Sequence, residues 1–332
     1  MQRYPKGQLN MKSSGWSKIY LSMFLISIAF GFSAGYGAFG ESRDYFSYNE
    51  FFSQLRPGRI FANFRFEPGF VFSTWVAKFA LGLELPATFS LLMSAALLLK
   101  SHSFSRAQHP ILTMLFYLAT WYPLHEYTQV RVAMATAFLF AAVNCFFANK
   151  RMMFILCGAL AVSFHGSAIF ALACVLTAHS LAPLRLRFSI PLLLGLSLSL
   201  SIILKSSMLP IMAAINPLTS AYITLADGFE VPTIFSGANI LTVAFLVLFY
   251  KASGFNSPRH RTLFLVTVAS LMVFVALRDV PVMAHRLKEI TLVFVTLLAF
   301  DYKISPQRVP QAAVAFGLAT WSLYKAVTLG VI

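Results

Sequence analysis

Long apolar runs alternate with short polar segments along almost the whole chain. The runs lie near residues 19–39, 110–124, 131–148, 152–164, 167–182, 188–204, 236–250, 262–277, 287–300 and 310–331. About 20 apolar residues in a helix cross a hydrocarbon core that is about 30 Å thick. Continuous runs lack the alternation of a membrane β-strand, and backbone polar groups in lipid must be satisfied within the segment. All of these runs are therefore predicted to be helices.

Residues 69–99 break this regularity. Gly82, Glu84 and Pro86 interrupt the segment and leave two apolar pieces. Each piece is shorter than the roughly 20 residues that a full crossing needs. We expect a broken or re-entrant pair that crosses the bilayer once.

The basic residues gather in alternate polar segments, which predicts the orientation. These segments are the leader, residues 1–18, and the loops near 100–109, 150–151, 185–187, 251–261 and 303–308. The positive-inside rule places all of them in the cytoplasm. The sequence thus predicts an all-α, polytopic membrane helix bundle of about eleven crossings, with its N-terminus inside and its C-terminus outside. The predicted outer loops lie near 40–68, 125–131, 205–235 and 278–288.

Composition supports one membrane domain. Of 332 residues, 58% are apolar and only 11% are charged, against about 25% charged in soluble domains, which excludes a water-soluble globule. The formal charge of +15 is spread over short loops without a basic run, so no nucleic-acid partner is expected. Residues 1–18 are a cytoplasmic leader and 19–332 a single multi-spanning domain. A basic leader before an apolar run also describes a signal peptide, but the first run is longer than a signal core and predicts a retained helix.

Several common kinds of site are missing from the sequence. Cys145, Cys157 and Cys174 lie inside apolar runs without the paired spacings of zinc sites or disulfide frameworks. No HExxH or P-loop motif is present, which argues against zinc hydrolases and P-loop nucleotide-binding enzymes. We expect no cofactor and no resident metal. A divalent ion held by Asp44, Glu67 and a bound diphosphate remains an alternative, because oxygen ligands leave no strong spacing pattern.

Two acidic residues of the first outer loop stand among aromatic residues. Asp44 and Glu67 are candidates for a general base, because partial burial among aromatic residues raises the pKa of a carboxylate, and a raised pKa suits proton transfer. Glu67 also precedes a proline, so a plain helix cap is the alternative. Tyr45 and Tyr48 offer a stacking surface for sugar rings, although aromatic belts at the membrane interface are the commoner cause of such residues.

Cationic residues and a histidine occupy the predicted outer ends of later helices. Gln129 and Arg131 begin one helix, where a guanidinium fork and the helix N-terminus suit phosphate oxygens. The alternative for Arg131 is an interfacial anchor. His165 stands between two apolar runs and is either a proton-transfer group or a packed turn residue. Arg278 and Arg286 lie in the last outer turn, where Arg286 either binds phosphate or pairs with Glu289, three residues on.

These segments, taken in order, resemble the EpsG family of exopolysaccharide polymerases, which are similar in role to the Wzy O-antigen polymerases. The matching segments are DYFSY (Asp44–Tyr48), FEPGF (Phe66–Phe70), QVRVAMA (Gln129–Ala135), FHGSAIF (Phe164–Phe170) and HRLKE (His285–Glu289). Family members commonly carry Gln after the arginine, where this chain has Val132.

The resemblance implies a membrane glycosyltransferase of the bacterial inner membrane that polymerises undecaprenyl-diphosphate-linked repeat units at the outer face into exopolysaccharide, capsule or O-antigen. Donor and acceptor would both be lipid-linked glycans, and a flippase and a chain-length regulator would act in the same pathway. In this interpretation Glu67, Asp44 and His165 serve catalysis, Glu67 being the first choice for the base. Arg131 and Arg286 bind the diphosphate, with Gln129, Tyr45, Tyr48 and Arg278 as further substrate contacts.

Two other classes of function stay open at this point. A transporter or flippase for a lipid-linked or anionic solute would place ionisable groups near the midplane of the membrane. Here only Lys78 and Glu84 are expected to lie deep. A glycan ligase or an O-acyltransferase would use similar outward residues on a different acceptor or donor.

Overall fold

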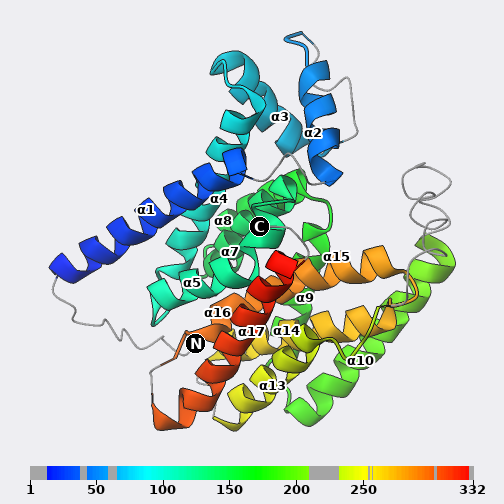
Figure 1. Cartoon of the computed structure of the whole chain (residues 1–332). Helices are drawn as coiled ribbons and strands as arrows, with labels where there is room; N and C mark the ends of the chain where they lie inside the picture. The colour runs from blue at the N-terminus through cyan, green and yellow to red at the C-terminus, as the bar shows by residue number, and fades with distance from the viewer. Residues whose placement is uncertain are drawn as a thin grey trace.

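The computed structural model describes residues 13–37, 43–58, 66–208, 232–252, 255, 257–302 and 305–328. Every regular element among them is helical (Figure 1). The longer helices are α1 (Ser13–Gly37), α2 (Arg43–Gln54), α4 (Leu85–Phe104), α5 (Pro110–Thr120), α7 (Val130–Phe147), α8 (Arg151–Phe164), α9 (Ala168–Leu181), α10 (Leu186–Ile203), α13 (Gly237–Lys251), α14 (Pro258–Ala276), α15 (Pro281–Leu292) and α17 (Val309–Thr328). The shorter elements are α3 (Pro68–Trp75), η2 (Val76–Ala80), α6 (Tyr122–His125), η3 (Leu204–Met208), η4 (Val293–Val295), α16 (Thr296–Ala299) and η5 (Pro306–Arg308).

Most helices coincide with the apolar runs of the sequence, and the all-helical fold class is confirmed for the described residues. Helix α2, however, lies within the predicted outer loop 40–68, and α15 begins within the predicted outer loop 278–288. Within the described ranges, four helices are both long and apolar enough to cross a membrane, namely 17–37 within α1, α7, α10 and α14. The count of eleven crossings stays a prediction. The leader up to residue 12 lies outside the described residues, and so do residues 209–231, which make up most of the predicted outer loop 205–235.

The segment 69–99 is broken where the sequence predicted it, but its second half is longer than expected. The chain turns after η2 at Gly82, whose φ of +65° suits a residue without a side chain. Helix α4 then runs for 20 residues, through Lys100 to Phe104. The expectation of two short pieces was therefore wrong for the second one, because Lys100 was assigned to a cytoplasmic loop although it lies inside the helix. Lys78, expected to lie deep, donates to the carbonyls of Phe52 and Leu55 at the end of α2.

Helices α1 and α4 pack closely because small residues face each other. An added Cβ at Gly31 would lie 2.3 Å from Ser94 Oγ, and one at Gly35 would lie 2.4 Å from the backbone nitrogen of Ser90. Near the other end of the pair, the Tyr20 hydroxyl lies 3.3 Å from Ser105 Oγ. The two helices are therefore antiparallel, and small residues let their backbones approach as in other membrane helix pairs.

Replacing Gly35 with alanine should separate this pair. Besides Ser90 Oγ at 2.0 Å, the added Cβ would meet two backbone atoms of α4, Ser90 N at 2.4 Å and Pro86 O at 2.5 Å. These backbone atoms cannot move aside, so the free energy of unfolding should fall by about 1–3 kcal/mol. The measurement is thermal unfolding of the purified protein in detergent. Gly195→Ala on α10 is the matched control, because no atom lies within 4 Å of its added Cβ, and we expect it to be neutral or slightly stabilising. Equal effects of the two substitutions would contradict close packing at Gly35.

The rest of the bundle brings distant segments to one end. Helices α7 and α8 are consecutive neighbours joined at Asn149, whose φ of +56° ends α7 with a left-handed residue. Helices α14 and α15 form a second consecutive pair, and α15 also packs on α9. Figure 1 shows α2 and α3 together at one end of the molecule, near the ends of α1 and α4. The start of α7, the turn between α8 and α9, and α15 thereby come within reach of α2.

Candidate functional site

A pocket lies where α2, the start of α7, the turn between α8 and α9, and α15 meet. Its cavity volume is about 40 Å³, within about 430 Å³ of space that includes open solvent. Its lining consists of Asp44, Tyr48, Gln129, Arg131, Val132, His165, Ser167, Arg286, Glu289 and Ile290. Four of the five matching segments of the sequence thus contribute to the lining of one pocket. The fifth segment carries Glu67, which contacts two of the lining residues.

Glu67 joins two of the residues that line the pocket. One carboxylate oxygen, Oε2, accepts a hydrogen bond from Arg131 Nη1 at 2.6 Å. The other oxygen, Oε1, lies 3.1 Å from His165 Nδ1. The side chains of Glu67 and Arg131 are 22% and 19% exposed, so this group is only partly screened by water. A single carboxylate therefore fixes both a guanidinium and an imidazole at the edge of the pocket.

The local sequence explains how Glu67 reaches His165. Glu67 is the extended residue before α3, and Pro68 occupies the first helical position, where its missing N–H costs nothing. An added Cβ at Gly69 would lie 2.8 Å from the carbonyl oxygen of Ser163, so only glycine lets α3 lie this close to the end of α8. His165 ends α8 in an extended conformation. The proline and the glycine of the FEPGF segment thus help to place its glutamate next to His165.

Arg131 is held on both sides. Its Nε donates to the Tyr48 hydroxyl at 3.3 Å, and its guanidinium carbon lies 4.8 Å from the centre of the Phe66 ring. The rings of Tyr48, Phe66 and Phe70 lie within 5.5 Å of one another in a buried aromatic cluster. Among the described residues, Glu67 and Tyr48 accept hydrogen bonds from two of the five N–H groups of the fork, which leaves the other donors for a bound anion.

The partners of Glu67 change its acidity. Burial alone would raise its pKa, but the hydrogen bond from His165 and the positive charge of Arg131 lower the pKa to about 2. Glu67 is consequently ionised at neutral pH and is a weak base. Burial also raises the pKa of the Tyr48 phenol, and there the opposing effect of Arg131 is too small to reverse the shift.

This low pKa predicts a specific pH dependence of stability. A carboxylate whose pKa is lower in the folded state stabilises the protein fully above its unfolded pKa, and the contribution is lost as the pH falls toward the folded value. The advantage of the wild type over Glu67→Gln in thermal unfolding should thus be constant from pH 7 to about 5 and shrink between about pH 4.5 and 2. If the difference in unfolding temperature between the wild type and Glu67→Gln stayed constant down to pH 2, the ion pairs of Glu67 with Arg131 and His165 would be contradicted.

The predicted site residues divide into three groups. Asp44, Tyr48, Gln129, Arg131, His165 and Arg286 line the pocket, and Glu67 contacts two of them. Tyr45 lies beside the pocket-lining residue Asp44 in α2, with its ring 6.2 Å from that of Phe46. Arg278 is half exposed beside Asp279, with 3.7 Å between Nε and Oδ1. Neither Tyr45 nor Arg278 is part of the lining.

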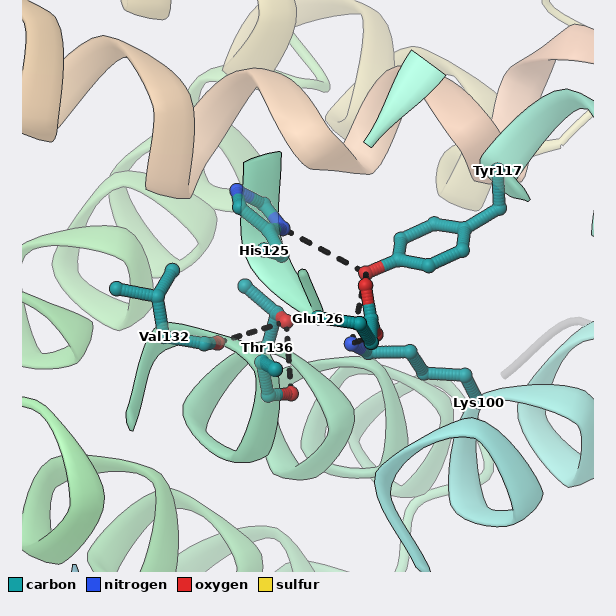
Figure 2. Close-up of polar contacts among 7 residues, drawn as sticks. Lys100, Tyr117, His125, Glu126, Val132 and Thr136 are labelled. Carbon is teal, nitrogen blue, oxygen red and sulfur yellow. Dashed lines mark hydrogen bonds and ion pairs between the residues drawn. The ribbon is translucent and has the colours of Figure 1, made fainter. Parts of the chain in front are cut away.

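A buried polar network next to the site was missed by the sequence analysis. Lys100 on α4 forms an ion pair with Glu126, and the Tyr117 hydroxyl donates to the same carboxylate at 2.9 Å. Figure 2 shows this hydroxyl between Glu126 and His125, with 3.5 Å to His125 Nδ1. All four side chains are fully buried. The sequence had placed Lys100 in a cytoplasmic loop and Glu126 in an outer one, so their pairing was not foreseen.

The network supports the segment that leads into the pocket. Glu126 follows α6, and Gln129 N donates to the carbonyl of His125 at 2.9 Å just before α7 begins. An unpaired charge buried at this depth is strongly unfavourable, so the pair fixes the turn on α4. One feature of the sequence could have indicated this pair. Lys100 and Glu126 stand on either side of a short apolar run, whose helix α5 has only 11 residues.

The described residues contain no group of three or more His, Cys, Asp or Glu side chains that could hold a metal ion. The three cysteines are unpaired and half-buried. The pocket therefore offers cations, one histidine, carboxylates and a phenol. Such a set can bind an oxyanion and transfer a proton.

The model of the EpsG family matches residues 18–329, nearly the whole chain. No curated protein and no solved structure matches.

Proposed function

The chain belongs to the EpsG family of exopolysaccharide polymerases, and from this premise we propose that it polymerises lipid-linked oligosaccharide repeat units. The growing glycan would leave undecaprenyl diphosphate and join the hydroxyl group at the non-reducing end of another lipid-linked unit. The reaction would take place at the outer face of the bacterial inner membrane, and the product would be exopolysaccharide, capsule or O-antigen. A flippase and a chain-length regulator of the same pathway would be its partners.

The observation that carries the proposal is the meeting of Arg131, Arg286, His165 and Asp44 in one pocket. These residues come from four separate parts of the chain, and each lies in or next to a segment that matches the family. Two arginines suit the two phosphates of a diphosphate, since a guanidinium binds phosphate oxygens through parallel N–H groups. The predicted topology puts all of these segments on the outer side.

In the proposed reaction a bond forms between the acceptor hydroxyl oxygen and the anomeric carbon of the donor. The bond from that carbon to the diphosphate oxygen breaks, and its electron pair stays with the diphosphate. Arg131 and Arg286 would stabilise the charge that develops there, which is commonly the largest contribution to this kind of catalysis. The hydroxyl proton passes to a base in the pocket.

We assign the base to His165, oriented by Glu67. Glu67 was the first choice from the sequence, but with a pKa of about 2 it suits an orienting role better than proton transfer. Its oxygen lies 3.1 Å from His165 Nδ1, which leaves the other ring nitrogen of His165, Nε2, to accept the proton. A carboxylate behind a histidine is the arrangement of hydrolase triads. Asp44, on the α2 side of the same pocket, is the alternative base or holds a sugar hydroxyl.

The lipid-linked and surface glycans of a deletion strain test this function. The strain would be complemented with the wild type or with Arg131→Ala at matched protein levels. With Arg131→Ala we expect single repeat units to accumulate on the outer-face lipid carrier and long polymer to be lost, whereas the wild type should restore the polymer. Units that remain on the cytoplasmic face would instead identify a transporter. Normal polymer that is not attached to lipid A core or protein would identify a ligase, and loss of acyl groups from normal polymer an acyltransferase.

A further inference from the structure

A second cluster of polar residues lies at the far end of the bundle from the pocket. Helix α7 runs from Arg131 at the pocket to Asn144, 13 residues or about 20 Å away. There Asn144 Nδ2 donates to the carbonyl of Ser103 at 3.2 Å, and Arg106 Nη1 donates to the carbonyl of Asn144 at 3.4 Å. The turn between α4 and α5 is thereby fixed at this far end, which the sequence predicts to be cytoplasmic.

Asp301 ties three segments together at this end. Its Oδ1 accepts a hydrogen bond from the backbone N–H of Gln108 at 3.2 Å, just before α5. Its Oδ2 lies 3.1 Å from His260 Nε2 and 4.0 Å from Arg259 Nε, both in the first turn of α14. Tyr302 and Arg308 follow Asp301 in sequence and lead into α17. We call the group of His109, Arg259, His260, Arg261, Asp301, Tyr302, Arg308 and Gln311 the inner-end cluster.

The inner-end cluster has more positive than negative charge. It contains three arginines and two histidines but one acid, Asp301, which is already engaged by His260 and Arg259. Arg308 is only 7% exposed. Among the described residues its guanidinium contacts the amide oxygen of Gln311 at 3.0 Å and the ring faces of Tyr302 and Phe249, at 5.1 and 5.7 Å from the ring centres, but no carboxylate. A buried guanidinium without a counter-charge is strongly unfavourable.

Hydrogen-bond donors are also in excess in the inner-end cluster. Gln311 Nε2 and Arg261 Nε are buried donors that have no hydrogen-bond partner in the described part of the chain. The same holds for His109 Nε2 and the Tyr302 hydroxyl. Buried polar groups in folded proteins are nearly always satisfied, so such a concentration calls for an additional acceptor. Water would satisfy some of these groups but would leave the positive charge of Arg308 unbalanced.

The backbone points to the same kind of ligand. Helices α5, α14 and α17 all begin at or next to the inner-end cluster, at Pro110, Pro258 and Val309. The first turn of each helix presents N–H groups and a partial positive charge, which favour anions. A carboxylic or phosphate oxyanion would match both this field and the orphaned donors, and tetrahedral phosphate oxygens can reach donors that arrive from several directions.

We propose that the inner-end cluster binds a phosphate group, with Arg308 as its principal ligand and Arg261, His109 and Gln311 as further donors. The group belongs to the headgroup of an anionic lipid or is free inorganic phosphate. This site is separate from the pocket and does not depend on the proposed polymerase activity.

Thermal unfolding in detergent tests the proposal. Wild type would be measured with added phosphatidylglycerol or phosphatidylcholine, and separately with inorganic phosphate or chloride at equal ionic strength. A ligand that binds only the folded state raises Tm by mass action, here by a few degrees. We expect this rise with phosphatidylglycerol if the ligand is a lipid headgroup, and with inorganic phosphate if it is the free ion.

Variants distinguish this site from general attraction to a basic surface. Arg308→Gln should lose the rise in Tm, whereas Arg185→Gln, which removes an exposed arginine at the start of α10, should keep it. If Arg308→Gln cannot be purified, the half-buried Arg261→Gln takes its place and should reduce the rise. The proposal is overturned if neither additive raises Tm, or if these variants respond as the wild type does.

Discussion

Arg131→Ala should lower polymer formation by about a hundredfold or more, the usual effect of removing one donor to a developing negative charge. Arg131 is the residue that connects the pocket to its supports, since it binds Glu67 at 2.6 Å and Tyr48 at 3.3 Å. These two contacts fix the orientation of the guanidinium at the pocket and thereby of its remaining N–H groups. Lysine at this position keeps the charge but loses the fork, so Arg131→Lys should restore little of the activity.

The measurement is the rate at which purified protein elongates lipid-linked repeat units, with surface polymer in cells as a second readout. Arg185→Ala is the matched control, because this exposed arginine lies at the start of α10 and lines no part of the pocket. Arg131→Ala protein that is present at the normal level and still makes long chains would show that this arginine does not bind the diphosphate.

Glu67→Gln should reduce the rate by about a hundredfold as well, for a different reason. The amide keeps the shape of the side chain but loses the charge that holds Arg131 and His165. If Glu67 acts through His165, the two residues form one unit, and the effects of changing them are strongly non-additive. The double variant Glu67→Gln with His165→Ala should then be no slower than the slower single variant.

A double-mutant cycle on the elongation rate measures this coupling. Rate losses that multiply in the double variant would assign independent roles to the two residues, and Glu67 or Asp44 would return as the base. Unfolding temperatures of all variants, recorded alongside, separate a loss of catalysis from a loss of fold.

Much of the fold could be read from local patterns. The apolar runs predicted the helices because burying a helix in an apolar surrounding depends on the residues of that helix alone. The break near Gly82 was predicted for the same local reason, since glycine and proline act on the backbone where they stand. The end of α4 was misplaced, because a lysine at the end of an apolar run looks like a loop residue until its partner is known. That partner, Glu126, lies 26 residues further along the chain.

The sequence by itself determined the helical class, the order of the segments and the residue types that carry the chemistry, because hydropathy and motif order are properties of the chain. Only the tertiary structure decided which of these residues meet. Glu67 and Arg131 are 64 positions apart, and Glu67 and His165 are 98 apart. Such contacts depend on how each helix is rotated about its axis and on close approaches such as that of Gly69 to Ser163. Packing of the whole bundle fixes these quantities, and no local pattern contains them.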